Sequence, residues 1–340
     1  MRWTFVTIIV AAAILAFSGV KSTGFELSVD SSVHTAVLAR LRALEPKLRM
    51  LANRTPGLVA ISVADANGLE SISINGDANL PAASVIKLPV MVEVMRQVAL
   101  GKFTLNRQVT LYSQDRDCGF GALCDDDAGM RFSVRNLTRI MIADSDNTAT
   151  NMLIRLVGRQ NVNATMSGLG LAQTRVGDSI HDGSSSIRSL RTSANDMMRL
   201  LAMIAGRRLV NARASDAMLA ILAAQRHNGY IPKPLPKGTI VAHKTGTLHD
   251  TLNDVGIVDL EGSPYIICVL TTHLDDLDDG ARFIRRASKV VYEAMRAARA
   301  DEAATAIPVP SPSEVVPQPS PSEPIEPSPS NPMDALELSP

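Results

Sequence analysis

The chain has 340 residues, of which 34 are Lys or Arg and 34 are Asp or Glu, so its formal net charge is zero. This balance gives no electrostatic reason to expect nucleic-acid binding, and an aromatic content of 4% provides few surfaces on which bases could stack. The length permits one large domain or two ordinary ones.

Both ends of the chain differ in composition from the rest. Residues 1–23 begin with the cation Arg2, followed by an apolar run and then small residues, which is typical of a secretory signal peptide. An uncleaved membrane anchor is the alternative, because residues 3–20 approach spanning length. Residues 307–340 alternate Pro with Ser and Glu, which predicts a disordered tail. We therefore expect one folded domain over residues 28–305, exported to the periplasm or beyond the cell, with membrane contact only through the signal segment.

The first folded elements are expected to be a helix and two strands. Residues 30–54 repeat Leu and Val at helical spacing, which predicts an amphipathic helix. Residues 58–65 and 71–75 have strand-like patterns on either side of a turn.

A second helix is predicted over residues 83–99, and it begins with Ser84 and Lys87. Residues three apart lie on one helix face, so the Lys87 amine can reach the Ser84 hydroxyl. Unpaired backbone N–H groups at a helix start can hold a developing oxyanion. The alternative for this pair alone is a capping serine beside a surface lysine.

Two of the three cysteines, Cys118 and Cys124, flank a glycine-rich stretch. They could form a disulfide in an oxidising compartment, and two free thiols are the alternative. Cys268 lies in an apolar run and is expected in the core. The six histidines are scattered singly, so neither a metal site nor another cofactor is predicted.

The middle of the chain is predicted to be mainly helical, and strands return near its end. Helical periods cover residues 135–143, 149–157 and 194–205, strand patterns cover 239–244, 254–260 and 265–271, and a last helix covers 280–299. Two early and three late strands predict an α+β fold. It consists of a five-stranded antiparallel sheet flanked by helices, with an all-helical lobe over about residues 88–225.

Two further motifs follow the serine and lysine: Ser145-Asp146-Asn147 and Lys244-Thr245-Gly246-Thr247. Each alone also fits a turn or a strand end. Together and in this order, the three motifs form the signature of penicillin-recognising serine hydrolases. From residue 56 to about 298 the sequence resembles class A β-lactamases, most clearly over residues 80–92, 141–153, 168–174 and 243–258.

The resemblance implies a β-lactamase/DD-peptidase-like fold and a nucleophilic role for Ser84, which would become acylated. Lys87 would accept its proton, and Ser145 would relay a proton toward the leaving nitrogen. The backbone N–H groups of Ser84 and Thr247 would form the oxyanion hole.

The resemblance also implies which residues bind the substrate. Asn147 would hold the substrate side-chain amide and brace Lys87. Lys244 and the Thr245 hydroxyl would meet the substrate carboxylate, beside Gly246. Lys233 is a candidate for an additional carboxylate-binding cation, and a solvated loop lysine is the alternative.

The sequence departs from class A enzymes in one loop. There the family has a glutamate that activates the water that clears the acyl-enzyme, whereas residues 174–193 contain no glutamate. Asp178, His181 and Asp182 are the candidate bases in that loop, and exposed turn residues are the alternative for all three. The departure predicts slow deacylation.

Three functions follow from these observations. The first is hydrolysis of β-lactams, and the second is a D-alanyl-D-alanine carboxypeptidase or other peptidoglycan hydrolase that penicillin inhibits. The third is an envelope protein that binds without turnover. The expected partner is a β-lactam or a peptidoglycan D-alanyl peptide, and the expected oligomeric state is a monomer.

Overall fold

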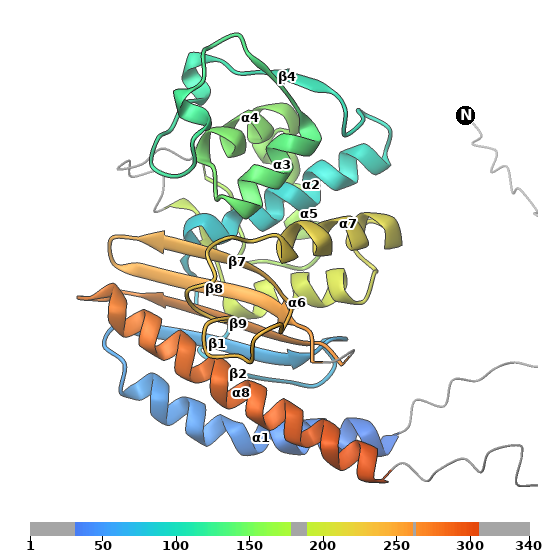
Figure 1. Cartoon of the computed structure of the whole chain (residues 1–340), viewed down its shortest axis with the longest axis vertical. Coiled ribbons are helices and arrows are strands. Elements are labelled where there is room, and N and C mark those ends of the chain that lie inside the picture. The colour runs from blue at the N-terminus through green and yellow to red at the C-terminus, as the bar shows by residue number, and fades with distance from the viewer. Residues whose placement is uncertain (1–30, 178–188, 261–262, 306–340) are drawn as a thin grey trace, which may run out of the picture.

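The computed structural model describes residues 31–177, 189–260 and 263–305 (Figure 1). Its centre is a sheet in the order β2-β1-β9-β8-β7, with every neighbouring pair antiparallel. The strands are β1 (Leu58–Asp65), β2 (Ser71–Ile74), β7 (Val241–Leu248), β8 (Thr251–Val258) and β9 (Tyr265–Thr272). The predicted five-stranded antiparallel sheet, assembled from both ends of the chain, is confirmed.

The sheet has a core on each face, because side chains alternate along its strands. On β1, Val59, Ile61 and Val63 belong to one buried cluster, whereas Ala60 and Ala64 belong to the other. Apolar side chains on both faces require a layer of helices on each side.

Two helices from the ends of the described chain cover the first face. Helices α1 (Ser31–Asn53) and α8 (Leu277–Thr305) lie side by side across the sheet (Figure 1). Their apolar side chains, among them Leu41, Leu48 and Ile284, join the cluster that contains Val59.

The second face carries the helical part of the molecule. Helix α6 (Ala194–Ala205) packs directly on β1, β8 and β9. The remaining helices lie on the same side of the sheet (Figure 1); they are α2 (Lys87–Ala99), α3 (Val134–Ala143), α4 (Asn147–Val157), α5 (Arg159–Gly168) and α7 (Ala212–Ala223). Two short strand pairs complete the description: β3 (Leu80–Pro81) with β6 (Arg191–Thr192), and β4 (Gln108–Thr110) with β5 (Arg131–Ser133).

Several predicted boundaries differ from the structure; β8, for example, covers Thr251–Val258 rather than residues 254–260. Two of the differences lie at the site described below. Strand β7 continues to Leu248 rather than ending at Lys244, and the segment Ala83–Ile86 forms a 3₁₀ turn, η1, before α2 begins. A side chain at Gly246 would approach the Ala83 Cβ to 3.0 Å. A larger residue would push η1 away from the strand, so Gly246 allows the close packing of η1 against β7.

Within the part of the chain that the structure describes, none of the helices combines the length and the apolar composition needed to cross a membrane. The predicted signal segment, residues 1–23, and the predicted tail, residues 307–340, lie outside the described residues.

Candidate active site

The hydroxyl of Ser84 lies beside the amine of a buried lysine. Lys87 Nζ donates a hydrogen bond to Ser84 Oγ over 3.0 Å. The side chain of Lys87 is completely buried, whereas Ser84 is partly exposed. Ser84 is therefore accessible to a ligand, whereas the Lys87 amine lies behind it.

The second motif reaches the same point from the turn between α3 and α4. Lys87 Nζ lies 3.2 Å from Ser145 Oγ, 2.5 Å from the Ser145 carbonyl oxygen and 2.7 Å from Asn147 Oδ1. Ser145 has a φ of +58°, a left-handed conformation that is uncommon for residues other than glycine and is often found at functional sites. Counting Ser84 Oγ, four oxygen atoms surround one nitrogen that has at most three protons.

The third motif completes the cluster from β7, at the edge of the sheet. Lys244 Nζ donates to Ser145 Oγ over 3.0 Å and to the Thr245 carbonyl oxygen over 2.9 Å. The Ser145 hydroxyl thus lies between two amines from different segments of the chain. The structure brings together Ser84, Lys87, Ser145 and Lys244, which the sequence analysis had selected.

Burial changes the proton affinity of both amines. Desolvation lowers the pKa of Lys87 well below its usual value, and the nearby charge of Lys244 lowers it further. Desolvation also lowers the pKa of Lys244, to about 7, against the opposing effect of the Asp254 carboxylate. A neutral lysine amine is a base, so the site holds a proton acceptor in contact with the Ser84 hydroxyl.

A cleft of about 230 Å³ opens over this cluster. Its lining comes from five parts of the chain: Ser84, Phe120, Ser145, His227 with Tyr230, and Thr245, Gly246 and Thr247. The lining includes the predicted substrate-binding residues Thr245, Gly246 and Thr247. Asn147 lies beneath it and is almost fully buried.

Lys233 is not among the residues that line the cleft, and its side chain is exposed. The structure therefore does not bring Lys233 into the cleft, and its position agrees with the alternative, a solvated loop lysine. The chain turns sharply here, with the Lys233 amide donating to the Tyr230 carbonyl oxygen. The buried Ile231 is anchored by a hydrogen bond from its amide to Asp254 Oδ2, 3.0 Å long. This anchor leaves Tyr230 and His227, rather than Lys233, at the cleft.

The sequence analysis did not select Phe120, His227 or Tyr230 as site residues. No motif marks these three side chains, and they reach the cleft from loops. The only sequence feature near any of them is the pair of cysteines on both sides of Phe120.

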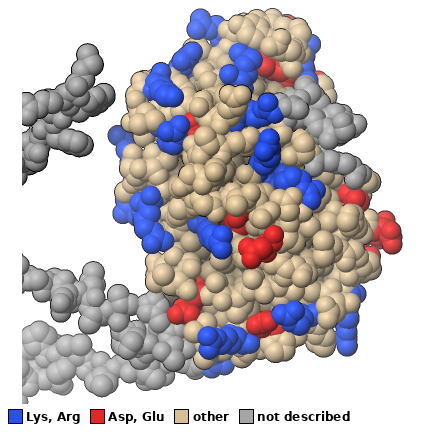
Figure 2. Space-filling view, turned by 180° about the vertical axis from the view of Figure 1, so that it is seen from behind, with Lys and Arg blue, Asp and Glu red and all other residues tan. Residues whose placement is uncertain are grey.

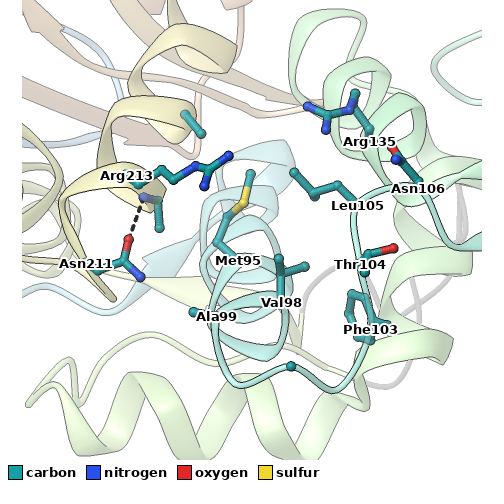
Figure 3. A pocket seen from close by; sticks show the side chains of 13 residues that line it. Met95, Val98, Ala99, Phe103, Thr104, Leu105, Asn106, Arg135, Asn211 and Arg213 are labelled. Carbon is teal, nitrogen blue, oxygen red and sulfur yellow. Dashed lines mark hydrogen bonds between the residues drawn. The ribbon is translucent and has the colours of Figure 1, made fainter.

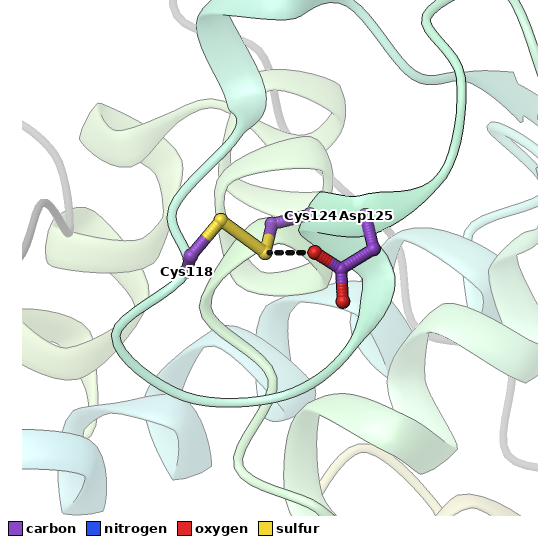
Figure 4. Close-up of side chains that lie close together, drawn as sticks. All are labelled: Cys118, Cys124 and Asp125. Carbon is purple, nitrogen blue, oxygen red and sulfur yellow. Dashed lines mark hydrogen bonds between the residues drawn. A yellow bond between two sulfur atoms is a disulfide. The ribbon is translucent and has the colours of Figure 1, made fainter.

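A disulfide joins Cys118 and Cys124 in the loop that carries Phe120 (Figure 4). Next to it, Asp117 Oδ1 accepts a hydrogen bond from the side-chain amide of Asn147 over 2.8 Å. Asn147 in turn holds Lys87, so the loop is connected to the catalytic cluster through two side chains.

The same loop is also fixed to the second motif. Asp146 Oδ2 accepts a hydrogen bond from the Leu123 amide over 2.9 Å, and Asp146 Oδ1 accepts one from the Ala149 amide at the start of α4. Burial raises the pKa of the Asp146 carboxyl, and the amide hydrogen bonds oppose this effect. The Gly121 backbone, with a φ of +90°, passes directly over this carboxylate.

Potential metal ligands gather at one place in the part of the chain that the structure describes, at Cys118, Cys124 and Asp125 (Figure 4). The two sulfur atoms are bonded to each other, so neither is available as a thiolate ligand.

The candidate bases Asp178, His181 and Asp182 lie outside the described residues. The described ends of their loop are held together: the backbones of Arg175 and Arg191 exchange hydrogen bonds of 2.9 and 3.0 Å. The Ala82 amide, two residues before Ser84, donates to the Leu190 carbonyl oxygen over 2.9 Å. Both ends of this loop therefore begin next to the segment that carries the serine.

Behind β7 lies a buried polar group that the sequence analysis did not predict. His243 Nδ1 is 2.8 Å from Asp254 Oδ1, and its Nε2 is 2.9 Å from Asn228 Oδ1. Both His243 and Asp254 are completely buried. Through these hydrogen bonds, His243 and Asp254 connect β7 and β8 to the segment that contains His227 and Tyr230.

The sequence is similar to known β-lactamases over most of its length. A model of the β-lactamase enzyme family matches residues 43–295. A β-lactamase of Bacteroides uniformis is 25% identical over 291 residues, which cover 79% of this chain and 97% of the relative.

Solved structures agree in fold. The structure of PBP-A is 28% identical, has a TM-score of 0.71 and covers 76% of this chain and 97% of its own. A mutant of PBP-A was solved as an acyl-enzyme complex with penicillin G, with a TM-score of 0.69 and 27% identity. The β-lactamase of Sphaerobacter thermophilus is 28% identical, with a TM-score of 0.66 and the same coverage as PBP-A.

Proposed function

The chain belongs to the β-lactamase enzyme family, and we propose that it opens the β-lactam ring through an acyl-enzyme formed on Ser84. The observation that carries the proposal is the 3.0 Å contact between Ser84 Oγ and the Nζ of the buried Lys87, whose pKa is lowered. A hydroxyl at its ordinary pKa is a weak nucleophile, and a base in contact with it removes this limitation.

Acylation proceeds in two steps. Lys87 takes the Ser84 proton while Oγ attacks the lactam carbonyl carbon, and the carbonyl oxygen becomes an oxyanion. The C–N bond of the ring then breaks, and the nitrogen receives a proton that passes from Lys87 through the Ser145 hydroxyl. The 3.2 Å distance from Lys87 Nζ to Ser145 Oγ supports this route.

The charges that form have partners in the cleft. We assign the oxyanion to the backbone N–H groups of Ser84 and Thr247, where the loss of one such donor costs about 3 kcal/mol in the transition state. The substrate carboxylate is assigned to Lys244 and the Thr245 hydroxyl. Asn147 is assigned both to the substrate side-chain amide and to bracing Lys87, to which its Oδ1 is already hydrogen-bonded.

Deacylation requires a water molecule that adds to the ester carbonyl and returns a proton to Ser84 Oγ. The absence of a glutamate from residues 174–193 supports slow release of the product. Asp178, His181 and Asp182 remain the predicted bases for this step.

The same absence favours a second candidate, a D-alanyl-D-alanine carboxypeptidase or related peptidoglycan hydrolase that penicillin acylates and inhibits. The likeness to PBP-A, which forms an acyl-enzyme with penicillin G as a mutant, supports this alternative.

Mass spectrometry of the protein with penicillin G, followed over time, separates the candidates. A Ser84 adduct that decays while penicilloate accumulates is the expected result for a β-lactamase. An adduct that persists supports the carboxypeptidase. The absence of both an adduct and penicilloate contradicts both and leaves the non-turnover binding protein. Ser84→Ala is the control in which no adduct should form.

We also propose that residues 1–23 direct export, so that the enzyme works in the periplasm or outside the cell as a monomer. The Cys118–Cys124 disulfide supports an oxidising compartment. Cell fractionation and N-terminal sequencing of the recovered protein test this proposal, and size-exclusion chromatography with light scattering tests the oligomeric state. A full-length cytoplasmic product would contradict export.

A further inference from the structure

A cavity of about 460 Å³ lies at the other end of α2 from Ser84. Met95, Val98 and Ala99, from the last part of α2, form its floor (Figure 3). The segment after α2, the start of α3 and the start of α7 form the walls. None of its lining residues belongs to the cleft over Ser84.

The interior of the cavity is apolar. Met95 and Phe103 are buried, and Val98 and Leu105 are partly buried and point into the space (Figure 3). Ala214 and Ala217 of α7 leave the space open because their side chains are small. Removal of this hydrocarbon surface from water favours the binding of an apolar chain.

The mouth of the cavity is basic. Arg135 of α3 and Arg213 of α7 are exposed and lie on different walls, with the apolar side chains between them (Figure 3). Within the described ranges, neither guanidinium forms an ion pair with a carboxylate.

Acidic residues are few around the mouth. The three segments that border it, residues 101–107, 131–139 and 206–214, contain no Asp or Glu, and Asp216 of α7 forms an ion pair with Arg207 over 2.7 Å. The three segments contain eight cations: Lys102, Arg107, Arg131, Arg135, Arg139, Arg207, Arg208 and Arg213. On the face that Figure 2 shows, basic side chains are spread over the helical part and acidic ones are few there.

We propose that this cavity binds a small anionic amphiphile, namely an unbranched hydrocarbon chain that ends in one carboxylate. The chain would lie against Met95, Val98 and Leu105, and the carboxylate would lie between Arg135 and Arg213. A carboxylate pairs with guanidinium groups in a fixed, bidentate geometry, which a neutral headgroup cannot reproduce. A cationic headgroup would be repelled. The inference is independent of the chemistry at Ser84.

Calorimetric titration of the full chain with decanoate, below its micelle concentration, tests the proposal. We expect one binding site and no measurable binding of decyltrimethylammonium, which has the same chain and the opposite charge. Arg135→Gln and Arg213→Gln should each weaken decanoate binding about tenfold. Arg139→Gln, an exposed arginine of the same helix that does not line the cavity, should leave it unchanged.

Two further measurements locate the bound chain. Ala217→Trp fills the cavity and should abolish decanoate binding in a protein whose circular dichroism is unchanged. An excess of penicillin G should leave the affinity for decanoate unaltered, because the two sites share no residue. Equal binding of decyltrimethylammonium, several sites per chain, insensitivity to both arginine substitutions, or competition with penicillin would each overturn the proposal.

Discussion

Lys87 and Lys244, both completely buried, point their amines at the same atom, the hydroxyl oxygen of Ser145, from distances of 3.2 and 3.0 Å. Burial out of water lowers the pKa of both lysines, and the nearby charge of Lys244 lowers the pKa of Lys87 further. The hydroxyl between them provides a path for a proton. A substrate carboxylate near Lys244 would favour its charged form and leave Lys87 as the neutral base.

The low pKa of Lys244 predicts how activity depends on pH. The free enzyme loses the Lys244 charge as the pH rises through about 7, so the kcat/KM for penicillin G should fall on the alkaline side of that value. Arginine stays charged throughout this range, so Lys244→Arg should remove the alkaline decline even if its maximum is lower. Lys233→Arg, exposed and outside the cleft, is the control and should keep the wild-type profile. If kcat/KM still falls at alkaline pH in Lys244→Arg, the decline arises from a group other than Lys244.

Asp117→Ala tests the link between the disulfide loop and the catalytic cluster. It removes the acceptor of the Asn147 amide and leaves a buried donor without its partner, which costs about 1–3 kcal/mol. Since Asn147 then holds Lys87 less firmly, we expect the rate of acylation by penicillin G to fall about tenfold. Asp127→Ala changes an exposed carboxylate of the same loop and should acylate at the wild-type rate. Equal rates in the two variants would show that Asp117 does not position the cluster.

Gly121→Ala tests the close approach of the loop to Asp146. A Cβ at this position would lie 2.1 Å from Asp146 Oδ2, so the loop or the carboxylate must move. Gly129 has a similar φ, +98° against +90°, but open space around its missing side chain. Both alanine variants should lose about 1 kcal/mol of stability from backbone strain, measured by urea unfolding. Gly121→Ala should lose more stability than Gly129→Ala and should also acylate more slowly. Equal stabilities and equal acylation rates in the two variants would contradict the importance of the contact with Asp146.

Removal of the disulfide should destabilise the protein. In the chain-entropy model, a cross-link across so few residues is worth about 2 kcal/mol. We therefore expect Cys118→Ser with Cys124→Ser to lower the free energy of unfolding by about this amount, and to slow acylation because Asp117 lies beside the cross-link. Reductant should reproduce the loss in the wild type and have no effect on the double variant. A stable wild type under reductant would mean that the Asp146 hydrogen bonds alone hold the loop.

Local periodicity was sufficient to predict most elements. The bounds predicted for β1 and α6 agree with the structure, because each element has a clear pattern and clear ends. Ser193 caps α6 by accepting a hydrogen bond from the Asp196 amide, and Gly206 follows its last residue. The two-residue strands β3 and β6 were not predicted, because two residues have no period.

The sequence by itself determined the order of the elements, the three motifs and, through them, the family. These depend on residue types at fixed spacings, which are local properties of the chain. Only the tertiary structure decided that Lys233 is exposed outside the cleft lining and that Phe120, His227 and Tyr230 belong to that lining. Such positions follow from anchors between distant segments, such as Ile231 on Asp254 and Asn147 on Asp117, which form only once the sheet and the helices have packed.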